Sequence, residues 1–362
     1  MFGKNKWPII IISGIFFTII YTFAGSKNST PLNTNSNWEQ HETPEKAGWS
    51  SERLEEAKRY YDTLGSTAAM VIYDGKILAS WGDVTRKSNI HSVRKSFLSA
   101  LYGIHINEGT IDIHATLKDL DIMDNVQLTE QEQQATIADL LTSRSGVFLT
   151  AGEESLWMRW TRPDRGLHLP GTHFYYNNWD FNVLGTIFKD KTNTDLFTEF
   201  KEKIAIPIGM EDYSVEDTSY KLEVNRSIHP SFLFRMSTRD MARFGQLYLQ
   251  NGMWEGKQII PNDWIKESTK VHTPVMNTEA YGYGYMWWVA DTEEFSDLGL
   301  YSAIGRYGQS IDIIPEKKLV FVHRVNSDNL LNRTIKQVSN KKRLTLLQKI
   351  LDAQVSEPEY EE

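Results

Sequence analysis

The spacing of apolar positions changes along the chain from short strand-like runs to helical periodicity. Residues 68–73 and 76–81 are short apolar runs on either side of Asp74-Gly75, which predicts two antiparallel strands joined by a tight turn. In residues 92–109 apolar side chains instead recur at helical spacing, and a glycine ends the run. This pattern predicts an amphipathic helix with one buried face directly after the hairpin.

The rest of the chain continues this order of elements. From about residue 117 to 239 the spacing is mainly helical, with long loops near 153–171 and 214–230. Strands at both ends with helices between them predict an α/β (α+β) fold, in which an antiparallel sheet is flanked by helices. We expect both chain ends to form the sheet, and a mainly helical lobe to be inserted at about 110–240. The predicted C-terminal elements are strands at 284–289, 301–304, 310–314 and 319–325 and a helix at 342–353.

The N-terminus differs from the rest. In residues 1–24 two lysines precede a long apolar run, a pattern typical of an export signal peptide. Left uncleaved, residues 7–24 would attach the protein to a membrane as an anchor. Both outcomes predict an exported, extracytoplasmic protein. The remaining divisions that we expect are a flexible, Ser- and Asn-rich spacer at 25–45, a folded domain at 46–353 and an acidic tail at 354–362.

Composition narrows the classes of function. The chain has 362 residues, of which 40% are hydrophobic, so it can bury a core of substantial size. Its net charge of -8 argues against a nucleic-acid partner. Because the chain has no cysteine, a thiol nucleophile is excluded. A Gly-x-Ser-x-Gly elbow and a His-Glu-x-x-His zinc motif are also missing, and we expect no metal.

The candidate nucleophile is the serine of Ser92-Val93-Arg94-Lys95, at the start of the predicted helix. Residues three apart share a helix face, so the Lys95 ammonium can reach the Ser92 hydroxyl. The N–H groups of the first turn also favour negative charge at that hydroxyl. A second string, Ser339-Asn340-Lys341-Lys342, fits the same pattern, but its run of cations indicates a solvated helix start. Ser92 is therefore the better candidate.

Two further segments could complete a site. Tyr175-Tyr176-Asn177-Asn178 contains two overlapping Tyr-x-Asn strings, either of which supplies a phenol for proton transfer. Their spacing alone leaves the choice of tyrosine open. Residues 304–309, glycine-rich and between two predicted strands, can offer a backbone N–H to a substrate oxygen, although a simple hairpin turn explains them as well.

In their order along residues 49–325, these segments together resemble the serine β-lactamase and penicillin-binding-protein superfamily, in its class C-like branch. The resemblance implies a β-lactamase/transpeptidase-like fold and no metal or organic cofactor. It also selects a tyrosine, because the family's Tyr-x-Asn tyrosine lies nine residues before the glycine of a Leu-Gly pair, which here is Gly185. The matching segments are Ser92 to Lys95, Thr136 to Gly146, Pro170-Gly171, Tyr176 to Asn178, Leu184-Gly185, Met236 to Gly245, Tyr283 to Trp288 and Gly305 to Gln309.

The resemblance also assigns roles to residues. Ser92 would be acylated, and Lys95 and Tyr176 would share the transfer of its proton. The other implied roles are orientation of the lysine and the substrate by Asn178, and an oxyanion hole formed beside Gly305 by the backbone N–H groups of Ser92 and Arg306.

One departure from the family pattern concerns the substrate. The family usually places Lys or His two residues before the glycine that aligns with Gly305, and this chain has Ala303 there. The loss of that cation argues against efficient penicillin turnover. The segments Gly305 to Gln309 and Arg144-Ser145-Gly146 most resemble the branch of 6-aminohexanoate-dimer hydrolases and related esterases.

The sequence therefore predicts an acyl-enzyme-forming serine hydrolase that acts on small-molecule or peptide esters or amides. Two alternatives stay open at this point. One is a penicillin-binding, D-amino-acid peptidase or β-lactamase activity in which Arg306 replaces the missing cation. The other is a non-catalytic module that binds peptidoglycan or senses a small amide.

Overall fold

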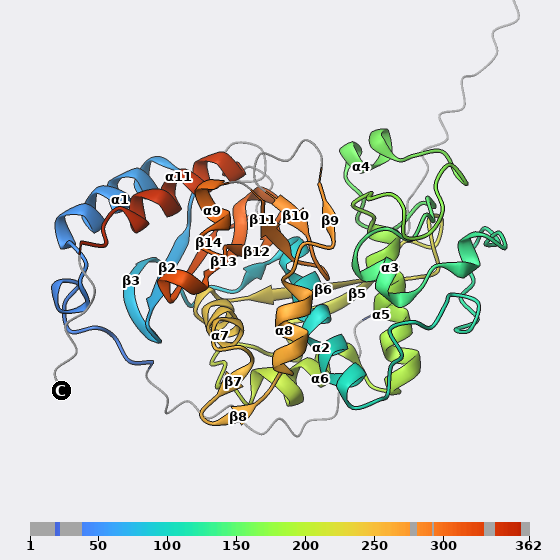
Figure 1. The fold of residues 1–362 in the computed structure, drawn as a ribbon, viewed down its shortest axis with the longest axis horizontal. Helices are drawn as coiled ribbons and strands as arrows, with labels where there is room; N and C mark the ends of the chain where they lie inside the picture. The colour runs from blue at the N-terminus through green and yellow to red at the C-terminus, as the bar shows by residue number, and fades with distance from the viewer. Residues whose placement is uncertain (1–18, 22–37, 276–280, 292, 329–336, 356–362) are drawn as a thin grey trace, which may run out of the picture.

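The main feature of the fold is an antiparallel sheet of eight strands built from both ends of the chain (Figure 1). The computed structural model describes residues 19–21, 38–275, 281–291, 293–328 and 337–355. The strand order in the sheet is β3-β2-β14-β13-β12-β11-β10-β9. The bounds are β2 Ala68–Tyr73, β3 Lys76–Gly82, β9 Thr273–Pro274, β10 Tyr281–Tyr283, β11 Trp288–Ala290, β12 Tyr301–Gly305, β13 Gln309–Ile314 and β14 Leu319–Arg324.

The predicted hairpin of β2 and β3 is confirmed. Asp74 and Gly75 have φ values of 46° and 81°, and this left-handed pair of residues suits the twist of a two-residue hairpin. β14 pairs with β2 from Leu319 opposite Tyr73 to Arg324 opposite Ala68, which joins the two ends of the chain. The predicted strands near residues 301–325 are likewise confirmed as β12, β13 and β14.

Helices cover both faces of this sheet (Figure 1). Helices α1 (Ser51–Thr63) and α11 (Asn340–Leu351) lie on one face, where their apolar side chains join Val71 of β2 in one core cluster. Met70, the preceding residue of β2, points to the other face and belongs to a second cluster. The helices of that second cluster are α2 (Arg94–Asn107), α7 (Thr238–Leu249) and α8 (Asn262–Ser268).

Helix α2 departs from the predicted pattern. The sequence predicts a helix with one buried face, but every residue from Arg94 to His105 is buried. α2 lies between the sheet and the helical lobe, so elements pack against it from several sides. A charged side chain in this part of the helix is therefore buried on whichever face of the helix it lies.

The inserted lobe is only in part helical. It contains α3 (Ile137–Leu141), α4 (Leu156–Thr161), α5 (Asn178–Thr192) and α6 (Leu196–Phe200). It also contains two strands that the sequence reading missed, which pair in a second sheet of order β1-β5-β6-β4. These strands carry Tyr220 and Phe234, whose rings pack with Phe197 and Phe200 of α6. The bounds are β1 Ile19–Tyr21, β4 Ser88–Asn89, β5 Thr218–Leu222 and β6 Ser231–Met236.

One predicted strand is wrong over most of its length. Of residues 284–289 only Trp288 and Val289 belong to a strand, β11. Residues 284–287 form a turn between β10 and β11, in which Met286 has a φ of 61° and the Gly284 N–H donates to Trp287 O at 2.8 Å. Gly284 packs so closely that a Cβ there would lie 2.2 Å from Ser268 O. The alternating Gly and aromatic residues suggest a strand locally, but this contact with the end of α8 bends the chain.

The terminal segments differ in part from prediction. Of the expected leader at 1–24 the structure describes only β1, which pairs with β5, and the other residues of the leader lie outside the described part. Within the expected spacer at 25–45, Trp38 Nε1 donates to Gly75 O at 2.8 Å and Gln40 bridges to Ile77. Among the described residues, none of the helices combines the length and apolar character that crossing a membrane requires. Of the acidic tail only residues 354–355 are described.

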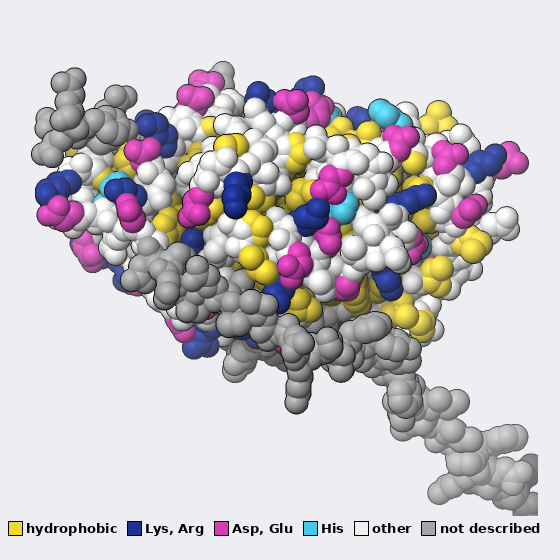
Figure 2. Space-filling model, turned by 90° about the horizontal axis from the view of Figure 1, so that it is seen from below, with side chains coloured by type: hydrophobic (Ala, Val, Ile, Leu, Met, Phe, Trp, Pro, Cys, Tyr) yellow, Lys and Arg dark blue, Asp and Glu magenta, His cyan; other side chains and the backbone are white. Residues whose placement is uncertain are grey.

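Charged side chains of both signs are interspersed over the face of the molecule seen in Figure 2. Several pair with neighbours along the chain, such as Lys58 with Asp62 at 2.6 Å and Arg86 with Asp83 at 3.1 Å. A groove that follows a phosphate backbone would require cations gathered along one track.

A buried arginine connects the two sheets. Arg324, at the end of β14, donates from Nε to Gln309 Oε1 at 2.7 Å and from Nη1 to Met236 O at 2.8 Å. Its Nη2 donates to the carbonyl of Ser88, in β4, at 3.0 Å. Because β4 leads directly into α2, these bonds fix the start of α2 relative to the large sheet.

A second buried arginine fixes α11 to the sheet. Arg343 and Asp312 form an ion pair in which both side chains are fully buried, and Arg343 Nη2 also donates to Tyr281 Oη at 2.9 Å. The hydroxyls of Ser302 and Ser310 donate to the same carboxylate at 2.6 and 2.8 Å. The carboxylate is thus satisfied only while this network is complete.

Replacing Arg343 with Met should therefore lower the free energy of unfolding by about 3 to 5 kcal/mol, because Asp312 would be left charged and buried without its partner. Urea denaturation followed by circular dichroism measures this change. Lys342→Met is the matched control, since Lys342 is exposed on the same helix. Equal stability of the two variants would show that the buried pair does not hold α11.

Candidate active site

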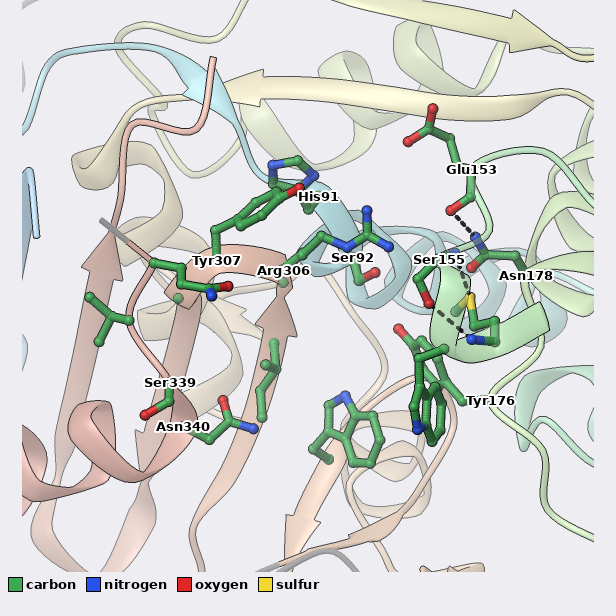
Figure 3. A pocket seen from close by; sticks show the side chains of 18 of the residues that line it. His91, Ser92, Glu153, Ser155, Tyr176, Asn178, Arg306, Tyr307, Ser339 and Asn340 are labelled. Carbon is green, nitrogen blue, oxygen red and sulfur yellow. Dashed lines mark hydrogen bonds between the residues drawn. The ribbon is translucent and has the colours of Figure 1, made fainter. Parts of the chain in front are cut away.

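A cavity of about 380 Å³ lies where the large sheet meets the helical lobe. Its lining includes His91 and Ser92 before α2, Tyr176 and Asn178 at the start of α5, and residues 305–308 after β12 (Figure 3). Segments far apart in the sequence thus meet around Ser92. Among the described residues, no group of three or more His, Asp or Glu side chains is arranged to hold a metal ion.

Ser92 lies in a short 3-10 turn, His91–Val93, and the α-helix itself begins at Arg94. The Ile90 N–H donates to Phe234 O at 3.2 Å, and the Val93 N–H donates to Ile90 O at 3.3 Å. His91 has a φ of 50°, so the chain turns sharply into the helix. This turn places the Ser92 hydroxyl at the cavity, ahead of the first turn of α2.

The Lys95 amine lies within hydrogen-bonding distance of three oxygens. Its Nζ is 3.1 Å from Ser92 Oγ, 2.7 Å from Tyr176 Oη and 3.0 Å from Asn178 Oδ1. The same atom lies 4.2 Å from the ring centroids of both Tyr176 and Phe181. Lys95 is only 1% exposed, and no carboxylate is among these neighbours.

Burial determines the protonation of this cluster. It lowers the pKa of Lys95 well below its ordinary value, and the charges of Arg94 and Arg306 lower it further, against an opposing effect of Glu153. Burial also raises the pKa of Tyr176 to about 12, although its hydrogen bond to Ser92 and the two arginines oppose that rise. The site thus favours an uncharged amine beside a protonated phenol.

The structure distinguishes between the two tyrosines that the spacing left open. Tyr175 Oη donates to Met158 O at 2.6 Å and so faces away from Ser92. Tyr176 is the phenol beside Lys95. Asn177 caps α5 by accepting from the Trp179 N–H at 3.1 Å, which leaves Asn178 to face the lysine.

Asn178 is oriented by an unusual backbone conformation. Its Nδ2 donates to Glu153 O at 2.8 Å, a bond drawn as a dashed line in Figure 3. Glu153 has a φ of 60°, a backbone angle that residues other than glycine rarely adopt. Its N–H donates to Glu223 Oε2 at 2.7 Å, and its carboxylate pairs with Lys221. These two anchors hold the Glu153 carbonyl toward Asn178.

The end of β12 packs directly against the turn that contains Ser92. A Cβ on Gly305 would lie 2.4 Å from Ile90 O and 3.3 Å from Ser92 N, so only glycine allows this approach. Figure 3 shows the Arg306 side chain extending from this strand end toward Ser92. Arg306 makes no ion pair with any residue that the structure describes, and Ala303 is buried two residues before Gly305.

The cavity also contains residues that the sequence analysis did not single out. Arg94, inside the serine–lysine motif, is 4% exposed and donates from Nη1 to His91 O at 3.1 Å. Its Nε and Nη2 have no partner within the described residues. Glu153, Trp157 and Trp288 also line the cavity. Arg94 and Trp288 fall inside matched segments, but the motifs give these residues no role, because their places at the cavity depend on how distant segments pack.

His91 is an unsuitable base despite lying next to Ser92. Its Nε2 is 2.6 Å from Ser327 Oγ, and its ring packs edge-on against Tyr307. Burial and the nearby arginines lower its pKa to about 3, so it stays neutral. Ser339, of the second serine–lysine string, accepts from the Lys342 N–H at 3.4 Å as the N-cap of α11, at the rim of the same cavity.

This arrangement agrees with the comparison to known families. Residues 53–337 match the family model described as Beta-lactamase. The chain belongs to the beta-lactamase family. Its fold and family are those of serine hydrolases, and the resemblance drawn from the ordered motifs is confirmed.

Individual relatives are more distant. A provisionally named 6-aminohexanoate-dimer hydrolase from Bacillus anthracis has a similar structure, with a TM-score of 0.67 at 20% identity over 93% of this chain and 90% of that one. A beta-lactamase/D-alanine carboxypeptidase from Pseudomonas syringae gives a TM-score of 0.60 at 15% identity over 83% and 97%. At these identities the likeness establishes the fold.

One curated relative is similar in sequence. An uncharacterised protein of Alkalihalophilus pseudofirmus is 32% identical over 100 residues, which are 25% of this chain and 30% of that protein. The match thus spans less than a third of the length of that relative.

The geometry around Glu153 predicts different outcomes for two substitutions. Glu153→Gly should retain most of the turnover, because glycine adopts a positive φ without strain and keeps the carbonyl toward Asn178. Glu153→Val should lower kcat by roughly thirtyfold, since a β-branched residue resists this conformation. Steady-state hydrolysis of a chromogenic ester measures both variants, and circular dichroism confirms that each is folded. Equal loss in the two variants would assign the role to the carboxylate instead.

Proposed function

We propose that this protein hydrolyses ester or amide bonds of small molecules or peptides through an acyl-enzyme on Ser92. The observation that carries the proposal is the buried cluster around Lys95. Its Nζ lies 3.1 Å from Ser92 Oγ and 2.7 Å from Tyr176 Oη, without a carboxylate among its hydrogen-bond partners. A neutral amine in such a place can accept the proton of the serine hydroxyl.

In the first step Ser92 Oγ forms a bond to the substrate carbonyl carbon while its proton passes to the Lys95 amine. The N–H groups of Ser92 and Arg306 are the candidate donors to the developing oxyanion. When the carbonyl carbon releases the leaving oxygen or nitrogen, that atom takes the proton, with the Tyr176 hydroxyl as the relay. The products are the acylated serine and a neutral alcohol or amine.

In the second step a water molecule attacks the acyl carbon and gives its proton to the same Lys95–Tyr176 pair. The bond between Ser92 Oγ and the acyl carbon breaks, and the serine recovers its proton. The free acid leaves, and the pair returns to its starting state. Asn178 holds the lysine in place throughout, because its amide is bonded on one side to Lys95 and on the other to the Glu153 carbonyl.

Two features support ester and amide substrates over penicillins. Ala303 supplies no cation for a substrate carboxylate, and it is buried within the sheet. The Bacillus anthracis protein of similar fold is named as a 6-aminohexanoate-dimer hydrolase. A location outside the cytoplasm, inferred from residues 1–24, is also part of this proposal.

A carboxypeptidase or β-lactamase activity is the second candidate. One observation favours it, since the Arg306 side chain extends toward Ser92 in Figure 3 and could hold a substrate carboxylate. The carboxypeptidase named for the Pseudomonas syringae structure of similar fold also supports it. Covalent labelling with a fluorescent penicillin distinguishes this candidate, because slow acylation relative to ester turnover favours the first proposal.

Replacing Ser92 with Ala should lower the turnover of 4-nitrophenyl acetate by roughly a thousandfold or more. It should also abolish labelling by a fluorophosphonate, with the modified residue mapped by mass spectrometry. Ser339→Ala is the matched control, because it alters the second serine–lysine string at the rim of the same cavity. Wild-type turnover in Ser92→Ala, or a label on Ser339, would contradict the assignment.

The charge of Arg306 predicts a shift in pH dependence. Arg306 lowers the pKa of Lys95, so Arg306→Gln should raise that pKa. Lys95 must be neutral to accept a proton, and kcat/KM should therefore begin to fall at a higher pH in the variant as the solution is acidified. Profiles of kcat/KM against pH with an uncharged ester measure the shift. Arg59→Gln, an exposed change on α1, should leave the profile in place, and an unshifted profile in Arg306→Gln would exclude Lys95 as the titrating base.

A further inference from the structure

Exposed apolar side chains gather beside the cavity. Twelve large hydrophobic side chains are exposed among the described residues, and five of them lie between residues 156 and 169. Trp157 is 60% exposed and Trp160 is 80% exposed, values well above those expected of an indole that packs in a core. Leu156, on the same short helix, is 60% exposed. Grouped apolar exposure of this kind marks a binding surface.

Helix α4, which carries these three residues, is firmly held. Ser155 caps it by accepting from the Met158 N–H at 3.1 Å, and Tyr175 Oη donates to Met158 O at 2.6 Å. Glu154, buried just before the helix, pairs with Arg162 just after it. The indoles are therefore presented outward by a fixed helix, so their exposure does not depend on a loose loop.

The apolar face reaches the cavity through Trp157, and Trp160 lies one helical turn further along α4. Ser155, Trp157 and Met158 line the same space as Ser92. Figure 3 shows Ser155 and Tyr176 on one side of Ser92, and Arg306 and Tyr307 on the other. A group bound against α4 is thus on the side of the phenol and away from the strand end at Gly305.

Proton transfer decides which half of a substrate occupies that side. The proton taken from Ser92 returns to the leaving atom, so the leaving atom must lie beside Lys95 and Tyr176. Chain attached to that atom then continues along the wall formed by α4. We propose that Leu156, Trp157 and Trp160 form a subsite for an apolar leaving group, an alkyl or aryl alcohol or amine. This inference rests on the proposed hydrolase function and specifies its substrate class.

Two matched ester series test the subsite. Acetates of ethanol, butanol, hexanol and octanol lengthen the leaving group, and ethyl esters of the corresponding acids lengthen the acyl group. In the wild type, kcat/KM should rise with alcohol length more steeply than with acid length. Trp157→Ala should lower the ratio of kcat/KM for octyl acetate to that for ethyl acetate by about tenfold, since alkyl area loses its contact with the indole. Trp160→Ala should lower it by about threefold.

Met253→Ala is the control, because Met253 is an exposed apolar residue of β7 (Met253–Trp254), far from α4 in Figure 1. Its ratio should equal that of the wild type. Unchanged ratios in both tryptophan variants would overturn the proposal, as would a loss confined to the acyl series. If the protein binds phosphatidylcholine vesicles through these tryptophans, and the octyl-to-ethyl acetate ratios stay unchanged in both variants, the apolar face is a lipid-binding surface instead.

A binding experiment tests the subsite separately from the hydrolase function. Binding of 1-octanol to Ser92→Ala, measured by calorimetry, requires no catalysis. If the wild type cleaves no ester but octanol binds and Trp157→Ala abolishes that binding, the subsite stands and the hydrolase proposal fails. If esters are cleaved through Ser92 without preference for longer alcohols, the hydrolase proposal stands and the subsite fails.

Discussion

The site depends on one physical constraint, the burial of the Lys95 amine without an ionic partner. Removing an ammonium from water costs several kcal/mol, and in this position no carboxylate offsets that cost. The cluster avoids it by favouring the uncharged amine, which Asn178 and Tyr176 can still satisfy by hydrogen bonds. The same desolvation that would destabilise a structural lysine thus makes this one fit to accept a proton.

The surrounding fold maintains this desolvation. α2 is buried on all sides because the large sheet and the helical lobe both pack against it. Arg324 connects the two sheets at the entry to α2, and Gly305 lets β12 approach the turn that holds Ser92. On the lobe side, the strained backbone at Glu153 directs its carbonyl to Asn178 and so holds that amide beside Lys95. Strain and buried charge are therefore concentrated around one amine.

Around that centre lie several side chains that shape the cavity. Ala303 replaces a cation, while Arg94 and Arg306 bring two other cations close to Lys95 and Tyr176. α4 adds an apolar wall on the side of the phenol. In the proposed function, the centre carries out acyl transfer and these surrounding groups select the substrate.

The sequence by itself determined the elements whose cause is local. The Asp74-Gly75 hairpin, the α2 helix, the serine and lysine three residues apart at its start, and the family to which the ordered motifs belong could all be inferred from it. The missed strands β5 and β6, the turn at Met286 and the anchoring of Asn178 by Glu153 depend on contacts between distant segments. Tyr176 lies between these two cases, because spacing alone allowed two tyrosines, the family resemblance selected Tyr176, and packing against Lys95 shows where each tyrosine lies. Local periodicity indicates which face of an element is apolar, whereas the tertiary structure decides which buried groups lie together in one site that excludes water.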